Sequence, residues 1–272
     1  MTIPVESETH FIWMPARYVS LFGDFGVQMY DIVTVVALVV GATGWLVMTR
    51  QIRVGVKKRL LALGLIGLTT VFFTRLFHIL FWGLEQNIAH PTLLVQLGHG
   101  RSIHGAVAGF WLSAFLISKL WRTPLPPLLN AISIWSVFGL VCARIGNFWN
   151  SEMVGTATTW STGIGFYFHG DHGTVIRHPV QLYEAALALM LLVILIVLYV
   201  RIRVTKTDHR YLPASVAFIG LGIIRFCCDF IKEEPGHLFG SLLTTGQILS
   251  IPLMLLGGWL LYLPFHKRQG NR

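Results

Sequence analysis

The chain has 272 residues, of which 54% are apolar and only 12% are charged. Soluble domains carry about 25% charged residues, so this composition excludes an ordinary water-soluble globule. Disordered chains and disulfide scaffolds are excluded as well, because the apolar fraction is high and the chain has only three cysteines. The lysines and arginines outnumber the acidic residues by 21 to 12, and this net charge of +9 raises the question of a nucleic-acid partner.

Seven runs of about 18 or more mostly apolar residues predict seven membrane-spanning helices. The predicted spans cover residues 29–49, 60–83, 103–121, 125–143, 180–200, 212–231 and 247–265. The connections are short except for 144–179, a stretch rich in Gly, Thr and His that predicts a small folded head outside the membrane. No linker between domains is apparent, so we expect a single polytopic domain over 1–272. The expected fold class is an all-α integral membrane protein.

Most basic residues fall on one side of the predicted membrane, in the first, third and fifth connections and the C-terminal tail. They are Arg50, Arg53, Lys57, Lys58, Arg59, Lys119, Arg122, Arg201, Arg203, Lys206, Arg210, Lys267, Arg268 and Arg272. Asp208 is the single acidic residue on that side. The positive-inside rule makes this side cytoplasmic, so we expect a periplasmic N-terminus, a cytoplasmic C-terminus and a periplasmic head. These residues are membrane anchors rather than one basic stripe, so we expect the lipid bilayer and no nucleic acid as a partner.

Seven basic residues remain once the cytoplasmic anchors are set aside. They are Arg17, Arg75, Arg101, Arg144, Arg177, Arg225 and Lys232. A charge at the centre of a spanning helix costs about 2.5–3.5 kcal/mol on insertion scales, so such residues usually face the protein interior and serve a function. Arg225 lies well inside an apolar run. Its alternative interpretation is a structural ion pair with Asp229, which lies on the same helical face at i,i+4.

Polar residues are concentrated just after the predicted end of the fourth span. One guanidinium, two amides, one carboxylate and two glycines fall within twelve residues, at Arg144, Asn147, Asn150, Glu152, Gly146 and Gly155. Such a segment can place hydrogen-bond donors around an anionic headgroup, and the planar fork of arginine suits a phosphate. The alternative is an arginine that only snorkels beside a tryptophan at the membrane surface.

A histidine begins the third predicted span. His104 is followed by Gly105 and Gly109, which allow close approach of another helix or of a ligand. Near neutral pH a histidine can take a proton from a thiol or hydroxyl, although a packing role is the alternative. Three further histidines are His169, His172 and His178. Their spacing matches no strong metal-binding motif, so we expect no metal ion.

Five short motifs stand out along the chain. The longest is Arg-Ile-Gly-Asn-Phe-Trp-Asn-Ser-Glu-Met-Val-Gly at 144–155. The others are Ser-Ile-His-Gly at 102–105, Arg-His-Pro-Val-Gln-Leu-Tyr-Glu at 177–184, Arg-Phe-Cys-Cys-Asp-Phe at 225–230 and Gly-Gln-Ile-Leu-Ser-Ile-Pro at 246–252. Together and in this order they closely resemble the prolipoprotein diacylglyceryl transferase family. Seven spans with an outside N-terminus are also the topology known for that family.

The resemblance implies a multi-pass lipid transferase of the bacterial cell inner membrane. Enzymes of the family move the diacylglyceryl group of phosphatidylglycerol onto the thiol of the lipobox cysteine in a prolipoprotein signal peptide. A thioether forms and glycerol phosphate is released, which is a step of lipoprotein maturation. The implied partners are therefore phosphatidylglycerol, the prolipoprotein and the bilayer. This chemistry requires no metal or organic cofactor, so we expect none.

The resemblance also implies roles for individual residues. Arg144 resembles the family's phosphatidylglycerol-binding arginine and Arg225 its second essential arginine, so the two are expected to clamp the phosphate. His104 matches the family's important histidine, and we expect it to activate the thiol. These three are the expected catalytic residues. The expected substrate-binding residues are Tyr30, Arg144, Asn147, Asn150, Glu152, Gly155, Arg225 and Asp229. We expect the phosphate site between the third, fourth and sixth spans.

The sequence departs from the family pattern at a few positions. Asp31 stands where glycine is usual, Leu221 replaces an expected tyrosine, Asp229 replaces a glutamate, and Arg101 is an additional arginine near His104. These differences leave open a divergent paralogue with another lipid donor or acceptor. A non-catalytic lipid or lipoprotein binder is a further alternative. A transporter is disfavoured, because no inverted repeat with paired broken helices is apparent.

Overall fold

The computed structural model describes residues 11–16, 18–22, 25–52, 54–90, 92, 102–205, 209–233 and 242–269, without the side chains of 21, 22, 25 and 264–269. Over these residues the chain is mostly helical, and seven helices are long and apolar enough to cross a membrane. The expected number of spans is therefore confirmed. The spanning helices are α1 (Met29–Met48), α2 (Val56–Phe81), α4 (Ile103–Trp121), α5 (Leu125–Trp149), α6 (Val180–Thr205), α7 (Leu212–Cys228) and α8 (Thr245–Gln269).

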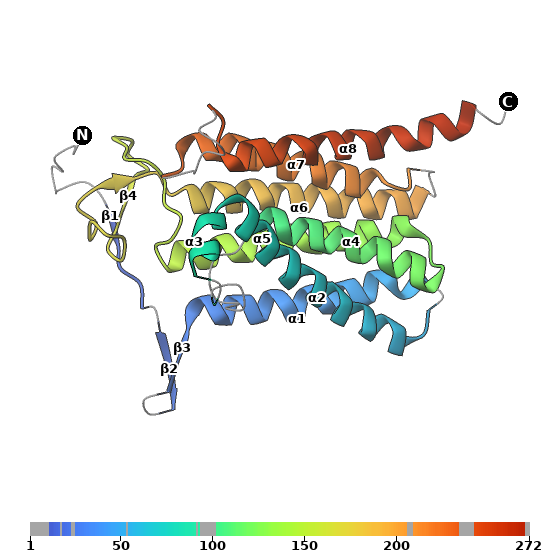
Figure 1. Cartoon of the computed structure of the whole chain (residues 1–272), viewed down its shortest axis with the longest axis horizontal. Helices are drawn as coiled ribbons and strands as arrows, with labels where there is room; N and C mark the ends of the chain where they lie inside the picture. Colours follow the sequence, from blue (N-terminus) through green and yellow to red (C-terminus); the bar gives the residue numbers. More distant parts are fainter. Residues whose placement is uncertain are drawn as a thin grey trace.

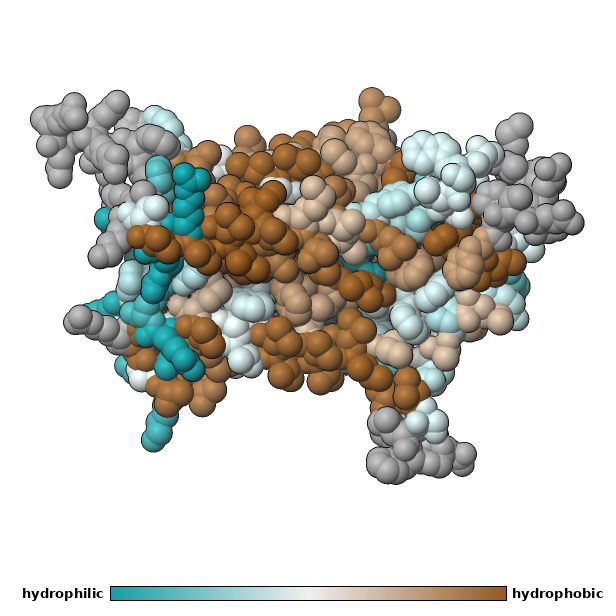
Figure 2. Space-filling model, turned by 180° about the vertical axis from the view of Figure 1, so that it is seen from behind, coloured by the Kyte–Doolittle hydropathy of each residue, from teal (hydrophilic) through white to brown (hydrophobic). Residues whose placement is uncertain are grey.

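Within the described residues, three shorter helices continue or connect these spans. The 3-10 turns η1 (Thr49–Gln51) and η3 (Asp229–Ile231) extend α1 and α7, and the short helix α3 (Leu84–Ala89) follows α2. The long helices run side by side along the bundle in Figure 1. Their exposed faces are apolar, and Figure 2 shows this as a broad brown surface over the middle of the molecule. Such a surface suits a protein whose solvent is lipid.

Basic side chains gather at one end of the bundle, where α1 leads into α2, α4 into α5, and α6 into α7 (right in Figure 1). We call this the basic end, and its described residues are Arg50, Lys57, Lys58, Arg59, Lys119, Arg122, Arg201, Arg203 and Arg210. The same end carries dense teal surface at the left of Figure 2. The structure thus brings together the charges that the sequence grouped. Arg53, Lys206, Asp208, Lys267, Arg268 and Arg272 lie outside the residues whose side chains the structure describes.

α5 is the central helix of the bundle. Two-thirds (67%) of its most apolar window is buried inside the protein, against 11% for α1, so α5 is surrounded by other helices while α1 is peripheral. Leu125 opens α5 and two prolines follow it in the first turn, where their missing N–H groups cost no intrahelical hydrogen bond. Its apolar residues pack with α6 and α7, as in the contacts of Val137, Leu191 and Leu221.

α4 packs closely on α2 through two glycines. A Cβ atom at Gly105 would collide with the backbone carbonyl of Phe73, and one at Gly109 with that of Thr69. The sequence predicted that these glycines allow close approach of a helix or a ligand, and in the structure α2 occupies that position. The first turn of α4 is capped by Ser102, whose hydroxyl accepts a hydrogen bond from the Gly105 amide at 3.4 Å.

The expectation of a purely α-helical fold is wrong in detail, because five short strands lie at the end opposite the basic end. The strands β1 (Phe11–Trp13), β4 (Ile164–Phe166) and β5 (Ile176–Arg177) form one sheet in the order β1-β4-β5. β1 pairs in parallel with β4, and β4 pairs antiparallel with β5. A separate hairpin of β2 (Tyr18–Phe22) and β3 (Phe25–Gln28) extends away from the bundle in Figure 1.

The boundary of the fourth span also differs from the expectation. α5 continues to Trp149 rather than ending at 143, so Arg144 belongs to a spanning helix and not to the head. The folded segment outside the helices runs from 150 to 179 and is joined by β1 from the N-terminal region. Trp13 ties the two together, because its ring stacks on Phe148 at 4.7 Å and its indole N–H donates to the Phe148 carbonyl at 3.1 Å.

Candidate active site

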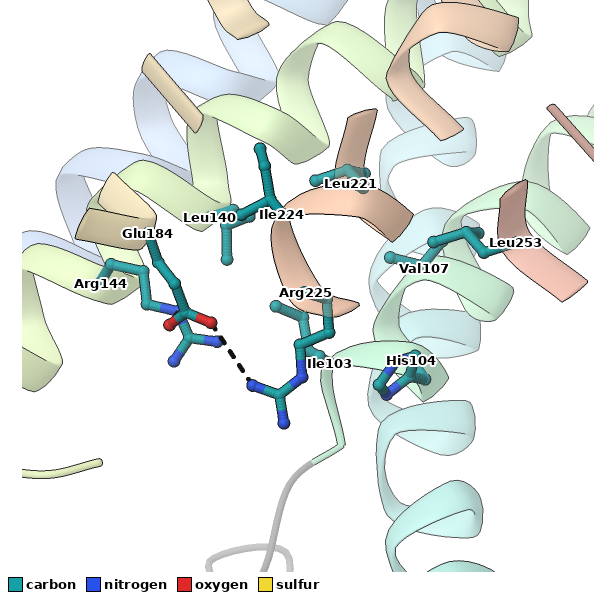
Figure 3. Close-up of a pocket in the computed structure, with 10 residues that line it drawn as sticks. All are labelled: Ile103, His104, Val107, Leu140, Arg144, Glu184, Leu221, Ile224, Arg225 and Leu253. Carbon is teal, nitrogen blue, oxygen red and sulfur yellow. Dashed lines mark hydrogen bonds and ion pairs between the residues drawn. The ribbon is translucent and has the colours of Figure 1, made fainter. Parts of the chain in front are cut away.

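A cavity of about 30 Å³ lies inside the bundle near the strand-bearing end, and five helices line it (Figure 3). The polar groups in its wall are Arg144 from α5, Glu184 from α6, Arg225 from α7 and His104 from α4. The remaining wall is apolar and consists of Ile103, Val107, Leu140, Leu221, Ile224 and Leu253. The structure therefore brings the three expected catalytic residues to one cavity. The third, fourth and sixth spans contribute as expected, and the fifth and seventh contribute too.

Glu184 is the centre of the charged cluster. Its Oε2 lies 2.7 Å from Nε of Arg144, and its Oε1 lies 3.5 Å from Nη1 of Arg225 and 3.8 Å from Nζ of Lys232. Only 3% of the Glu184 side chain is exposed, so water cannot screen these pairs effectively. Figure 3 shows the carboxylate between the two guanidinium groups. Each charge would be costly to bury alone, and the cluster as a whole offsets that cost.

Asp229 holds the other side of Arg225. Its Oδ1 lies 3.0 Å from Nη2 of Arg225, which confirms the i,i+4 ion pair considered from the sequence. The Thr244 hydroxyl donates to Oδ2 of Asp229 at 2.6 Å. A Cβ atom at Gly246 would collide with both members of the pair, so a larger residue there would displace them. Arg225 therefore both pairs with Asp229 and lines the cavity, so the two interpretations of this residue do not exclude each other.

The polar residues after Arg144 support its side chain and do not line the cavity. Nη1 of Arg144 donates to Oδ1 of Asn147 at 3.3 Å. The side-chain amides of Asn147 and Asn150 each donate to one oxygen of Glu152 at 3.2 Å, and Gln181 donates to the Glu152 carbonyl at 2.6 Å. Arg144 is only 4% exposed, so it does not snorkel to the membrane surface. It is fixed by partners on two helices.

His104 lies on the far side of Arg225 from Arg144 (Figure 3). It is 9% exposed, and its ring is nearly parallel to that of Trp82 at a centroid distance of 6.3 Å. The α4 helix starts at Ile103, so His104 sits in its first turn. A base at this position can reach a reacting group only inside the cavity, because the bulk of its ring is covered.

Tyr30 and Gly155 lie next to the cluster rather than in the cavity wall. The ring of Tyr30 on α1 packs against Gly146, and a Cβ atom at Gly146 would come within 2.8 Å of it. Gly155 forms a β-bridge with Lys232, and a Cβ atom there would come within 2.6 Å of both His178 and Val180. Both contacts therefore shape the surroundings of the charged residues.

The sequence matches a family model described as prolipoprotein diacylglyceryl transferase over residues 17–263. The chain belongs to the prolipoprotein diacylglyceryl transferase family. A relative from Chlamydia muridarum, named phosphatidylglycerol--prolipoprotein diacylglyceryl transferase, is 35% identical over 82% of this chain and 81% of its own length. Relatives of the same name from Chlamydia pneumoniae and Pseudomonas fluorescens are 36% and 30% identical, over 73% and 71% of this chain and 71% of their own lengths. The resemblance read from the five motifs is confirmed.

Two residues of the charged cluster, Glu184 and Lys232, were not predicted from the sequence as site residues. Glu184 closes the motif at 177–184, and Lys232 was among the seven basic residues outside the cytoplasmic anchors. A carboxylate in the apolar run of α6 was the signal for Glu184, since a buried acid needs a basic partner. Burial, together with the nearby charges of Arg225 and Arg144, lowers the pKa of Lys232 to about 7.

Other basic residues outside the anchors have separate structural partners. Arg75 on α2 donates to the side chain of Asn87 at 3.1 Å, away from the cavity wall. Arg177 lies 2.8 Å from Asp171 and 2.6 Å from Glu233, and so ties the head to the segment after α7. Arg17 and Arg101 lie outside the described residues. Within the described part of the chain, no group of three or more His, Cys, Asp or Glu side chains is arranged to hold a metal ion.

Two of the family departures, Leu221 and Asp31, lie in different surroundings. Leu221 lines the cavity, so the substitution of an expected tyrosine removes a hydroxyl from its wall. Asp31 is exposed in the first turn of α1, where its charge complements the helix dipole. Only the first of these changes the surface that a ligand in the cavity would meet.

Proposed function

We propose that this protein transfers the diacylglyceryl group of phosphatidylglycerol to the lipobox cysteine of a prolipoprotein. Family membership and the printed names of the relatives support this reaction. The observation that carries the proposal is the convergence of Arg144 and Arg225 on Glu184 in a cavity that His104 also lines. Two guanidinium groups and a base side by side are what the transfer of a phosphate-activated glycerol group to a thiol requires.

The reaction begins with the acceptor thiol. A cysteine thiol has a pKa near 8.5 and is mostly protonated at neutral pH, so a base must remove its proton. In this proposal Nε2 or Nδ1 of His104 takes that proton. The thiolate then attacks the glycerol carbon that carries the phosphate ester. A carbon–sulfur bond forms, the carbon–oxygen bond breaks, and glycerol phosphate leaves with the electron pair.

The arginines stabilise the leaving phosphate. Three cations, Arg144, Arg225 and Lys232, face two carboxylates, so the fully ionised cluster retains one positive charge for an anionic headgroup. The Arg225–Glu184 contact is the looser arginine pair at 3.5 Å. A phosphate can therefore replace Glu184 as the partner of Arg225 while Arg144 keeps its closer contact. Fixed guanidinium groups in an apolar cavity stabilise developing charge more strongly than water does.

The cavity must open to admit the donor lipid. Its volume of about 30 Å³ has room for little more than a water molecule or two, which is far less than a glycerol phosphate headgroup needs. Arg225 is the most exposed member of the cluster, with 17% of its side chain accessible. Movement of Arg225 towards an arriving phosphate would enlarge the cavity on the side of His104.

The topology belongs to the same proposal. We place the basic end in the cytoplasm and the strand-bearing head in the periplasm of a bacterial cell inner membrane, with a periplasmic N-terminus and a cytoplasmic C-terminus. The support is the clustering of nine described basic residues at the end opposite the strands. The catalytic cavity then lies near the periplasmic face, where the lipobox cysteine of an exported protein arrives.

The direct test uses the purified full-length chain. It is incubated with phosphatidylglycerol and a lipobox peptide, and the peptide is analysed by mass spectrometry. We expect a mass increase equal to one diacylglyceryl group in thioether linkage, and no increase when the peptide cysteine is serine. Absence of product with this pair, together with turnover of another phospholipid, would indicate a different lipid donor. Leu221 in the cavity wall would then be the first residue to substitute.

A further inference from the structure

We propose that Thr244 is a positioning residue for the transfer reaction, because its hydroxyl holds Asp229, and through it Arg225, at the place where the donor phosphate binds. This inference rests on the proposed function. Thr244 lies directly before α8, and the motif at 246–252 in that helix has no residue in the described cavity wall. The motif therefore contributes through the residues that it supports.

The turn that begins α8 is closed by two reciprocal hydrogen bonds. The amide of Thr244 donates to Oε1 of Gln247 at 3.0 Å, and the amide of Gln247 donates to the Thr244 hydroxyl at 3.0 Å. This is the arrangement of a capping box, which satisfies two amides that the start of a helix would leave without partners. Thr244 and Gln247 are 5% and 1% exposed, so water cannot readily replace these bonds. The turn is therefore tightly fixed.

The Thr244 hydroxyl does more than cap the helix. As a cap it only accepts a hydrogen bond, and its single hydrogen goes to Oδ2 of Asp229 at 2.6 Å. Asp229 is 1% exposed, and its Oδ1 lies 3.0 Å from Nη2 of Arg225. Gln247 adds a second attachment to α7, because its Nε2 donates to the Phe226 carbonyl at 3.3 Å. The turn is thus bound to the end of α7 directly after Arg225.

The guanidinium of Arg225 consequently has a held side and an exchangeable side. Nη2 pairs with Asp229, and a Cβ atom at Gly246 would lie within 2.9 Å of both Nε and Nη2, so this side rests on the turn. Nη1 has the longer contact of 3.5 Å with Glu184. Exchange of Glu184 for a phosphate therefore needs Arg225 to pivot about the held side. His104 lies next to the backbone of the same Gly246, so the turn also sets the spacing between His104 and Arg225.

An equilibrium titration of phosphatidylglycerol into the purified full-length protein, without acceptor peptide, tests this role. Thr244→Val removes the hydroxyl at nearly constant volume, and we expect donor binding to weaken about tenfold, as for other lost hydrogen bonds to a charged group. Thr244→Ser restores the hydroxyl and should bind within about twofold of the wild type. Equal binding by Thr244→Val and the wild type would overturn the proposal.

The matched control is Thr49→Val at the basic end. There a fully buried threonine hydroxyl donates to the Trp45 carbonyl at 2.7 Å, far along the bundle from the cavity. This variant should bind phosphatidylglycerol as the wild type does. An equal loss in Thr49→Val and Thr244→Val would overturn the proposal, because any buried threonine would then have the same effect.

A double-mutant cycle with Asp229→Asn separates positioning from the loss of a helix cap. If Thr244 acts through Asp229, Thr244→Val should weaken binding no further once Asp229→Asn is present. Additive losses would show that Thr244 acts independently of Asp229 and would overturn the positioning role. A wild type that neither binds nor transfers phosphatidylglycerol would refute the proposed function and this inference together. A wild type that turns over, with unchanged binding by Thr244→Val, would refute this inference alone.

Discussion

At the scale of single residues, the side chain of Arg144 is tightly held in the cavity that we propose as catalytic. Nε pairs with Glu184 at 2.7 Å and Nη1 donates to Asn147 at 3.3 Å, so the plane of its guanidinium is fixed from two sides. A lysine would keep the charge but lose the fork that meets two phosphate oxygens at once. Replacement of Arg144 by lysine therefore tests the geometry of the phosphate contact while the positive charge is kept.

We expect Arg144→Lys to lower transferase turnover by at least tenfold, because the bidentate contact with the leaving phosphate is lost. The measurement is thioether formation with phosphatidylglycerol and a lipobox peptide. The matched control is Arg201→Lys, an exposed residue at the basic end, which should retain full turnover. Full turnover of Arg144→Lys would remove the bidentate contact from the mechanism.

His104 is expected to act only on the thiol. His104→Gln keeps a polar side chain of similar size, so donor binding should persist while turnover at pH 7 falls by about 100-fold or more, as is typical of a lost general base. Turnover should recover in part at pH 9, where the acceptor thiol ionises without help. Rates measured at the two pH values check this. Unchanged turnover at pH 7 would show that another group removes the proton.

Lys232 predicts a pH dependence of donor binding. Its lowered pKa of about 7 means that the amine carries its charge below this pH and loses it as the pH rises. Phosphatidylglycerol should therefore bind more weakly at pH 8.5 than at pH 6 in an equilibrium assay without acceptor peptide. Lys232→Arg stays charged over this range and should bind equally at both pH values. The same slope in both proteins would assign the dependence to another group of the cluster.

At the scale of elements, the hydropathy pattern located all seven spans but not all of their ends. It ended the fourth span at 143, because Arg144 and Asn147 look like the polar residues of a helix end. In the structure α6 and α7 surround these residues and supply partners, so the helix continues to Trp149. A local pattern cannot reveal this, since the partner Glu184 lies 40 residues further along the chain.

The three-stranded sheet of the head was also beyond the reach of a local pattern. β1 pairs with β4 across about 150 residues, with Phe11 opposite Ile164, and both strands have only three residues. Such short strands carry little periodicity. The polar residues that meet at the cavity were easier to single out, because charges in apolar runs are conspicuous and the motifs resemble a known family. Glu184 and Lys232 were missed because their role depends on which helices meet.

Arg177 ties the head to the charged cluster around Glu184. Its guanidinium joins Asp171 in the head to Glu233, which directly follows Lys232. We expect Arg177→Gln to lower the unfolding temperature by a few degrees and to weaken phosphatidylglycerol binding, because Lys232 loses its positioning. A thermal unfolding curve and a donor titration measure the two effects. Asp31→Asn, at an exposed residue of α1, is the control. Wild-type values for both quantities would show that the tie is dispensable.

At the scale of the whole molecule, the net charge of +9 divides between two ends with different tasks. The basic end anchors the bundle in the cytoplasmic half of the membrane in our proposal, and the opposite end carries the strands and the proposed catalytic cavity. A chain of this composition can keep so many buried charges only where they pair with one another. The cluster around Glu184 meets this condition.

The orientation can be tested by cysteine labelling in intact cells. After Cys227 is replaced by serine, Ser161→Cys in the head should react with a membrane-impermeant maleimide that has crossed the outer membrane. Arg203→Cys at the basic end should react only after the inner membrane is opened. Both positions are exposed on the protein surface, so burial does not confound the comparison. The reverse pattern would invert the proposed topology.

The central claim is that the phosphate of the donor lipid lies between Arg144 and Arg225, within reach of a thiol placed beside His104. The most direct measurement is an experimental structure with a non-reactive phosphatidylglycerol analogue bound. We predict phosphate oxygens within hydrogen-bonding distance of both guanidinium groups, with Arg225 moved away from Glu184. A headgroup bound elsewhere, with the Arg225–Glu184 contact intact, would contradict the account.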